Sequence, residues 1–164
     1  MNNFYKKYLL LLIGLMLLTT QCGFYSFSGS TLPPHIKTVA VPLFEDKTAE
    51  FGIDQQLTDA LIEAIIMDNT LQIADLKDAN AVLTGTITRV EERAGAYSED
   101  EEASDFNIYV SVKVTFEDRV KRRVMWEQSL SEFGTFQPGD RQTGLDEAIE
   151  KLTTKIINQM VSNW

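Results

Sequence analysis

Apolar and polar residues alternate between residues 106 and 116, which is the most regular pattern in the chain. A period of two residues is typical of a β-strand that buries one face. Residues 120–130 repeat the alternation in phase, with a polar turn at 117–119 between the two segments. We therefore predict a β-hairpin with one strongly apolar face. On the first strand that face consists of Phe106, Ile108, Val110, Val112, Val114 and Phe116.

Three other segments have the composition of strands. Residues 36–43 carry apolar side chains on both faces, which indicates an interior strand, and Pro42 limits its length because proline has no N–H for the ladder. Residues 82–90 are rich in β-branched side chains around Gly85, and residues 71–74 are a shorter candidate. Loops are predicted at 93–105 and 133–142.

Two segments change to a period of three to four residues, the pattern of an amphipathic helix. The first begins at Ile53 and ends near Asp68, and the second continues to residue 164 after Thr143, which we predict as its N-cap. Their apolar stripes include Ile53, Leu57, Leu61 and Ile65 in the first helix, and Leu145, Ile149, Leu152, Ile156 and Met160 in the second.

These elements predict an α+β fold. The order is strand, helix, short strand, three meander strands and helix, and the meander has one strongly apolar face. Such elements bury their apolar surfaces most simply as two layers. We predict a two-layer sandwich in which two amphipathic helices pack on one face of a roughly four-stranded mixed sheet.

The first residues differ from everything that follows. Lys6 and Lys7 precede an apolar run over residues 8–18, and Cys22 follows shortly afterwards. Eleven helical residues rise about 16 Å, roughly half of a hydrocarbon core, which suits the apolar region of an export signal better than a membrane span. We predict a signal peptide at 1–21, a lipid-attached tether at 22–34 and one domain at 35–164.

Cys22 is the single cysteine of the chain, so it has no internal disulfide partner. Its place at the end of the signal peptide predicts acylation of its thiol, with palmitate as a candidate lipid, and hence a membrane tether. Gln21 stands where lipoprotein signal peptidase prefers a small residue. A plain cleaved signal peptide and an uncleaved anchor therefore stay as alternatives.

The charge of the chain limits its partners. The formal net charge is −9, and residues 1–21 hold two of the 15 basic residues and none of the 24 acidic ones, so the remaining 143 residues carry about −11. This balance argues against general nucleic-acid binding, because no broad face would neutralise phosphates. It still allows a local basic patch.

The residue types that carry catalysis are sparse. His35 is the only histidine, so the sequence has no His/His or Cys/His pair with the spacing of metal ligands. It also shows no evident Ser-His-acid catalytic set. The glycines do not lead into a phosphate-binding Lys-Ser/Thr helix start. The acidic residues Glu99, Asp100, Glu101 and Glu102 lack the spacing of a calcium loop and favour a solvated loop. We predict no enzyme activity, no metal site and no cofactor.

Two arginines are the candidate ligand-binding residues. In a meander, the loops that follow the 82–90 and 120–130 strands emerge at the same end of the sheet, which places Arg93 and Arg141 at one end. Their guanidinium groups suit an anionic lipid head group. The alternative is that they neutralise residues 99–102. The basic run 121–123 is denser, but on a strand residues 121 and 123 would face one way and residue 122 the other. We therefore predict that its side chains are solvated or protect a sheet edge from pairing with another strand.

The first residues after the signal peptide resemble a known family. Residues 22–29, Cys-Gly-Phe-Tyr-Ser-Phe-Ser-Gly, and residues 32–44, Leu-Pro-Pro-His-Ile-Lys-Thr-Val-Ala-Val-Pro-Leu-Phe, resemble the start of the lipopolysaccharide-assembly lipoprotein LptE family, especially its Bacteroidetes-type branch. The later order of strands and helices is compatible with that family over the whole domain.

The resemblance implies a periplasm-facing lipoprotein that is lipid-anchored through Cys22 in the outer membrane. Such a protein would plug an LptD-like β-barrel, help to assemble it for lipopolysaccharide transport to the cell surface, and bind lipopolysaccharide itself. The alternative function is a lipoprotein subunit of another secretion or envelope-stress complex. Neither function involves nucleic acid.

Overall fold

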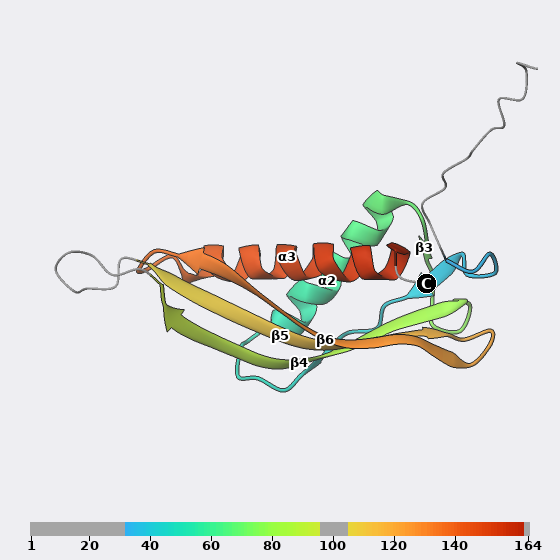
Figure 1. The fold of residues 1–164 in the computed structure, drawn as a ribbon, viewed down its shortest axis with the longest axis horizontal. Coiled ribbons are helices and arrows are strands. Elements are labelled where there is room, and N and C mark those ends of the chain that lie inside the picture. The colour runs from blue at the N-terminus through green and yellow to red at the C-terminus, as the bar shows by residue number, and fades with distance from the viewer. Residues whose placement is uncertain (1–31, 96–104, 163–164) are drawn as a thin grey trace, which may run out of the picture.

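The computed structural model describes residues 32–95 and 105–162, which form two layers (Figure 1). One layer is a six-stranded sheet, and the other contains two helices that cover one of its faces. Cys22, the tether up to residue 31 and the acidic residues 99–102 lie outside the described residues. The elements are β1 (Thr38–Ala40), β2 (Glu45–Asp46), α2 (Ile53–Asp68), β3 (Gln72–Ile73), β4 (Ala81–Ala94), β5 (Phe106–Asp118), β6 (Arg123–Phe136) and α3 (Arg141–Ser162).

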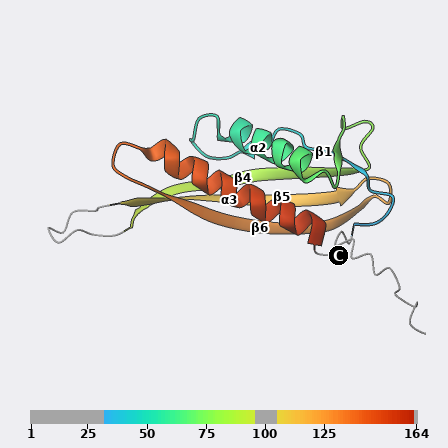
Figure 2. The ribbon, with the colours of Figure 1, turned by 90° about the horizontal axis from the view of Figure 1, so that it is seen from above.

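The sheet is mixed, and its strand order is β3-β1-β4-β5-β6, with β2 also paired to β4. β1 runs parallel to β3 and β4, and β2 runs parallel to β4. The long strands β4, β5 and β6 form an antiparallel meander. In Figure 2 α3 lies along β5 and β6, and α2 lies beside it nearer to β1 and β4. This arrangement confirms the predicted α+β sandwich.

The core lies between the sheet and the helices. The alternating residues of β5 from Ile108 to Phe116 are buried, as the period of two predicts. Against them pack the apolar stripes of both helices. The opposite face of the meander remains open, and we call it the open face. Its residues, set by the register, are Thr84, Thr86, Arg89, Glu91 and Arg93 on β4, Asn107, Tyr109, Ser111, Lys113 and Thr115 on β5, and Glu127, Ser129, Ser131, Phe133 and Thr135 on β6.

Several boundaries differ from the sequence-based expectation. The predicted strand 36–43 is shorter, because β1 ends at Ala40 before Pro42, and β2 forms separately at 45–46 within a polar stretch. β4 and β6 extend into the predicted loops, as far as Ala94 and Phe136. The sheet therefore has six strands rather than four, although β2 and β3 contribute only two residues each.

The start of α3 and the β5–β6 turn also differ. α3 begins at Arg141, which makes Asp140 the N-cap position, so the predicted cap was wrong by three residues. Thr143 lies within the first turn, and its hydroxyl donates to Asp140 Oδ1 at 2.8 Å. The β5–β6 turn comprises residues 119–122 rather than 117–119. Asp118 causes this shift, since its carboxylate accepts a hydrogen bond from the backbone N–H of Lys121 at 2.9 Å.

Gly85 allows the segment between β1 and β2 to close over the sheet. A Cβ at this position would overlap the ring of Phe44, which is buried against the core side of β4. The backbone N–H of Phe44 donates to Thr58 Oγ1 on α2 at 3.1 Å. The missing side chain at Gly85 thus makes room for an aromatic ring that connects α2 to the sheet.

Replacing Gly85 by alanine should therefore destabilise the domain. We expect the free energy of unfolding to fall by about 1–3 kcal/mol, because the ring of Phe44 must leave its site. Urea unfolding measures the change. Thr84→Ala, on the open face of the same strand, is the matched control and should change stability by less than about 0.5 kcal/mol. Equal effects of the two substitutions would contradict this packing account.

Candidate functional site

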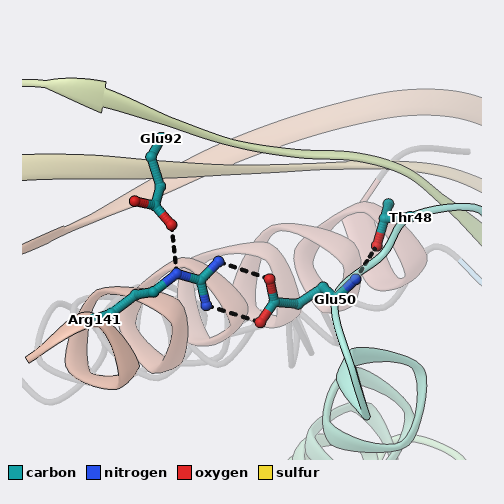
Figure 3. Close-up of polar contacts among 4 residues, drawn as sticks. All are labelled: Thr48, Glu50, Glu92 and Arg141. Atoms are coloured by element: carbon teal, nitrogen blue, oxygen red, sulfur yellow. Dashed lines mark hydrogen bonds and ion pairs between the residues drawn. The ribbon is translucent and has the colours of Figure 1, made fainter.

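Arg141 is the centre of an ion-pair cluster at the end of the sheet where α3 begins (Figure 3). Its two terminal nitrogens donate to the carboxylate oxygens of Glu50 at 2.8 and 2.6 Å, and its Nε donates to Glu92. The paired geometry with Glu50 matches the fork of the guanidinium group. The cluster therefore ties α3 to β4 and to the segment before α2.

Local hydrogen bonds position Glu50 for this contact. Its backbone N–H donates to Thr48 Oγ1 at 3.1 Å, and the backbone N–H of Thr48 donates to Asp46 Oδ1 at 2.7 Å. These short-range contacts shape the segment between β2 and α2. Hydrogen bonds to Glu50, and then to Glu92, outweigh burial and raise the pKa of Arg141 above its ordinary value, so the side chain stays charged.

Arg93 lies at the same end, on the open face of β4. It pairs with Glu91, and its guanidinium lies 4.5 Å from the centre of the Tyr109 ring. Tyr109 contacts Phe133 across the β5–β6 pair with ring centres 5.2 Å apart. Arg93 therefore belongs to a small aromatic and charged cluster in which the cation contacts a ring face.

The structure brings the two candidate arginines to one end but not to one site. The register places Arg93 opposite Asn107 on the open face, whereas Glu92, the partner of Arg141, is opposite Ile108 on the helix-covered face. The sheet therefore separates the two guanidinium groups. Each contacts a glutamate among the described residues, and their proposed contact with residues 99–102 lies outside them. Binding of an anionic head group stays a prediction.

A second cluster occupies the opposite end of the sheet, around the buried Asp118. His35 Nε2 lies 2.8 Å from Asp118 Oδ2, and the side chain of Asp118 is 0% exposed. Burial opposes ionisation of Asp118, but hydrogen bonds from the Lys121 backbone and from His35 outweigh it and hold the pKa of Asp118 below its ordinary value of 3.8. An ionised carboxylate only accepts, so the imidazole donates.

Sequence reasoning did not find the partners in either cluster. It assigned no partner to His35, whereas the structure joins His35 to a residue 83 positions away. Glu50 is 91 positions from Arg141 and lies in a stretch that reads as a polar connection. No motif marks such pairs, because their contact depends on how distant elements pack.

The described residues show neither a metal cluster nor a membrane-crossing helix. Over 32–95 and 105–162, no three histidine, cysteine or acidic side chains are grouped so that they would hold a metal ion. Within the same ranges, neither helix has the length and apolar character needed to cross a bilayer.

Comparison with known proteins identifies the family. The family model described as LptE, lipopolysaccharide-assembly, matches residues 36–163. The chain belongs to the LptE family. Its general role is therefore in lipopolysaccharide assembly. No curated protein matches the chain.

Solved structures of similar fold agree with the architecture. A Xanthomonas campestris protein is 11% identical with a TM-score of 0.60, covering 79% of this chain and 86% of that one. A hypothetical protein of Chlamydia trachomatis is 14% identical with a TM-score of 0.59, covering 76% and 95%. The rare lipoprotein B of Shewanella oneidensis is 11% identical with a TM-score of 0.52, covering 74% and 92%. At these identities the likeness concerns the fold alone.

The Asp118 cluster predicts how this LptE-family protein responds to acid. Because the pKa of Asp118 is lowered on folding, its charge stabilises the fold above about pH 4 and loses that effect as the pH falls through the folded-state pKa. We expect Asp118→Asn to cost about 1–3 kcal/mol at pH 7 and progressively less as the pH falls below about 4. Urea unfolding across this range measures the difference.

Asp59→Asn is the control for this experiment, because Asp59 is exposed on α2 and its carboxylate accepts a hydrogen bond from the exposed Gln55 of the same helix at 2.9 Å. It should shift stability by less than about 0.5 kcal/mol at either pH. An Asp118→Asn curve that runs parallel to that of the unmodified protein down to pH 3 would rule out this role of the carboxylate.

Proposed function

We propose that this protein is a periplasm-facing outer-membrane lipoprotein, attached through a lipid on Cys22, that sits inside an LptD-like β-barrel and helps to assemble it for lipopolysaccharide transport. Membership of the LptE family over residues 36–163 carries the proposal. The single cysteine after an apolar leader supports the anchor.

The open face is the structural feature that fits such a plug. Its centre consists of hydroxyl side chains and of two ion pairs, Lys113 with Glu127 at 2.8 Å and Arg89 with Glu91 at 3.6 Å. Ser111 donates to Ser131 at 3.0 Å across the β5–β6 pair. The lumen of an outer-membrane barrel is polar, so this face would exchange hydrogen bonds with the wall at little desolvation cost.

The length of this face also suits a barrel. β5 has 13 residues, and β4 and β6 have 14 each. At about 3.3 Å per residue, such strands span about 43 Å, which exceeds the apolar band of a barrel, about 25 Å tall. The meander is therefore long enough to contact the wall through the whole membrane and to reach beyond it at either end.

Binding of an anionic lipid head group by Arg93 or Arg141 belongs to the same proposal. Lipopolysaccharide carries such groups, and the guanidinium fork suits phosphate. An incoming phosphate would compete with Glu91 for Arg93, or with Glu50 and Glu92 for Arg141. Arg93 is the more accessible candidate because its side chain is 58% exposed, against 38% for Arg141.

Co-purification tests the proposed partner. The full chain, extracted from native membranes in mild detergent, should bring down a large β-barrel protein and lipopolysaccharide. Ser131→Trp adds a bulky ring to the open face and should lower barrel recovery about tenfold if that face meets the wall. Lys77→Trp is the control, because Lys77 lies on the exposed β3–β4 loop and not on the open face. It should leave barrel recovery unchanged.

Two results would contradict the proposal. Recovery of the chain only as a free monomer, with normal surface lipopolysaccharide after its depletion, would exclude the barrel role. Recovery with a different secretion or envelope-stress complex would favour the alternative function. Circular dichroism of the purified variants shows that each is folded before their recoveries are compared.

A further inference from the structure

The cations of this acidic protein are not equally neutralised. Most lysines and arginines of the described residues have a carboxylate within 4.0 Å, as Lys47, Lys113, Arg141 and Lys155 illustrate. The exceptions in residues 32–95 and 105–162 come from two distant segments that meet at Asn80, whose side-chain oxygen accepts from the backbone N–H of Lys37 and whose carbonyl oxygen accepts from the backbone N–H of Arg119. They are Lys37, Arg119, Lys121 and Arg122.

The β5–β6 turn holds three of these four residues. Residues 119–122 form the turn at the right-hand end of Figure 1, away from the end where α3 begins. Lys121 and Arg122 are exposed, and Arg119 is partly exposed. Arg123, the next residue, is exposed and lies 3.8 Å from the buried Asp118. We call residues 119–123 together with Lys37 the basic end.

Asp118 shapes this surface and offsets one of its positive charges. Its carboxylate accepts hydrogen bonds from the backbone N–H of Lys121 and from the imidazole of His35, and it lies 3.8 Å from Arg123. Arg122 adopts a positive φ of 52°, which reverses the chain direction within the turn. Lys121 and Arg122 therefore lie in a turn, so the strand alternation considered for residues 121–123 does not apply to them, and Arg123 is the first residue of β6.

Two exposed valines accompany the cations. Val120 is 58% exposed and lies between Arg119 and Lys121, and Val124 is 57% exposed and follows Arg123. A single exposed valine is ordinary. Apolar side chains interleaved with unpaired cations at a projecting tip are typical of surfaces that meet a lipid interface, where the apolar groups enter the head-group layer and the cations bind phosphates.

The basic end also lies where the chain arrives from its N-terminal region. Leu32 packs against the core, and His35 is joined to Asp118. Cys22 is ten residues before Leu32, so it lies within about 36 Å of chain length. A membrane attachment at Cys22 or in the apolar leader would keep the basic end at high effective concentration near that membrane.

We propose that the basic end is a docking surface for the anionic phospholipid head groups of the membrane leaflet to which the N-terminal region is attached. Nearby acidic groups are Glu117 and Asp118 and, on the β3–β4 loop, Asp75 and Asp78, of which Asp78 contacts Lys77. The five cations of the basic end exceed the uncompensated acids, whereas the chain as a whole carries −9. Docking orients the domain, with the Arg141 end directed away from the leaflet.

A membrane fits these observations better than a discrete anion or an acidic protein. The cations project from a convex tip rather than converging on one point, and a plane of charged head groups satisfies such an arrangement without a defined pocket. The proposal rests on the envelope location proposed above, but its test does not require the barrel or the lipid on Cys22.

Vesicle flotation tests the surface directly. The full chain should bind vesicles of phosphatidylethanolamine and phosphatidylglycerol at least about tenfold more strongly than vesicles of phosphatidylethanolamine alone, and high salt should remove the difference. The double variant Lys121→Glu/Arg122→Glu should lose this preference. The apolar leader is present in all variants, so its own contribution to vesicle binding is the same in each.

The matched control is Lys47→Glu/Arg89→Glu, which changes net charge by the same amount at exposed sites in the middle of the sheet. It should keep most of the preference for phosphatidylglycerol. Urea unfolding midpoints close to that of the unmodified chain show that both variants are folded.

Three results of the vesicle experiment would overturn the proposal: no preference for phosphatidylglycerol in the unmodified chain, full preference in the turn variant, or an equal loss of preference in the control variant.

Barrel recovery separates this proposal from the proposed function. Loss of barrel recovery in the turn variant without any change in vesicle binding would assign the basic end to a protein partner, and it too overturns the proposal. Vesicle preference without barrel recovery would contradict the proposed function and leave this surface intact.

Discussion

The antiparallel pairing of β5 with β4 and β6 is the constraint on which the other features depend. Because side chains alternate along a strand, one register places the residues from Ile108 to Phe116 under the helices and sends the hydroxyl-rich set to the open face. A slip of one residue would exchange the two faces. The same pairing separates Arg93 from Arg141 and brings Asp118 to the far end of the meander.

The two ends of the meander have different electrostatic organisation. At the α3 start, Glu50, Glu91 and Glu92 neutralise two arginines, and the cluster connects α3 to the sheet. At the β5–β6 turn, Asp118 shapes the backbone and lies 3.8 Å from Arg123, whereas Arg119, Lys121 and Arg122 have no carboxylate within 4.0 Å among the described residues. A long polar face between a neutralised end and a basic end suits a plug that has a defined orientation relative to a membrane.

Long periodic segments made the helices and the central hairpin predictable, because their apolar stripes report burial directly. The ends of β4 and β6 were not predictable, since Glu91, Glu92 and Arg93 are held in the sheet by backbone pairing with β5 rather than by apolar side chains. β2 was missed because it consists of two polar residues that are held by parallel pairing with β4. The Arg141–Glu50 and His35–Asp118 contacts join residues 91 and 83 positions apart, a relation that one sequence does not reveal.

The central claim is that the open face lies against the wall of an outer-membrane barrel while the basic end lies at the membrane surface. Site-specific photo-crosslinking in living cells tests both parts, with the reactive side chain at Ser131 or at Val120 in the full chain. We predict an adduct with a large β-barrel protein from Ser131 and a lipid adduct, without the barrel, from Val120. Absence of the barrel adduct at Ser131, in cells where the chain is present and folded, would contradict the account.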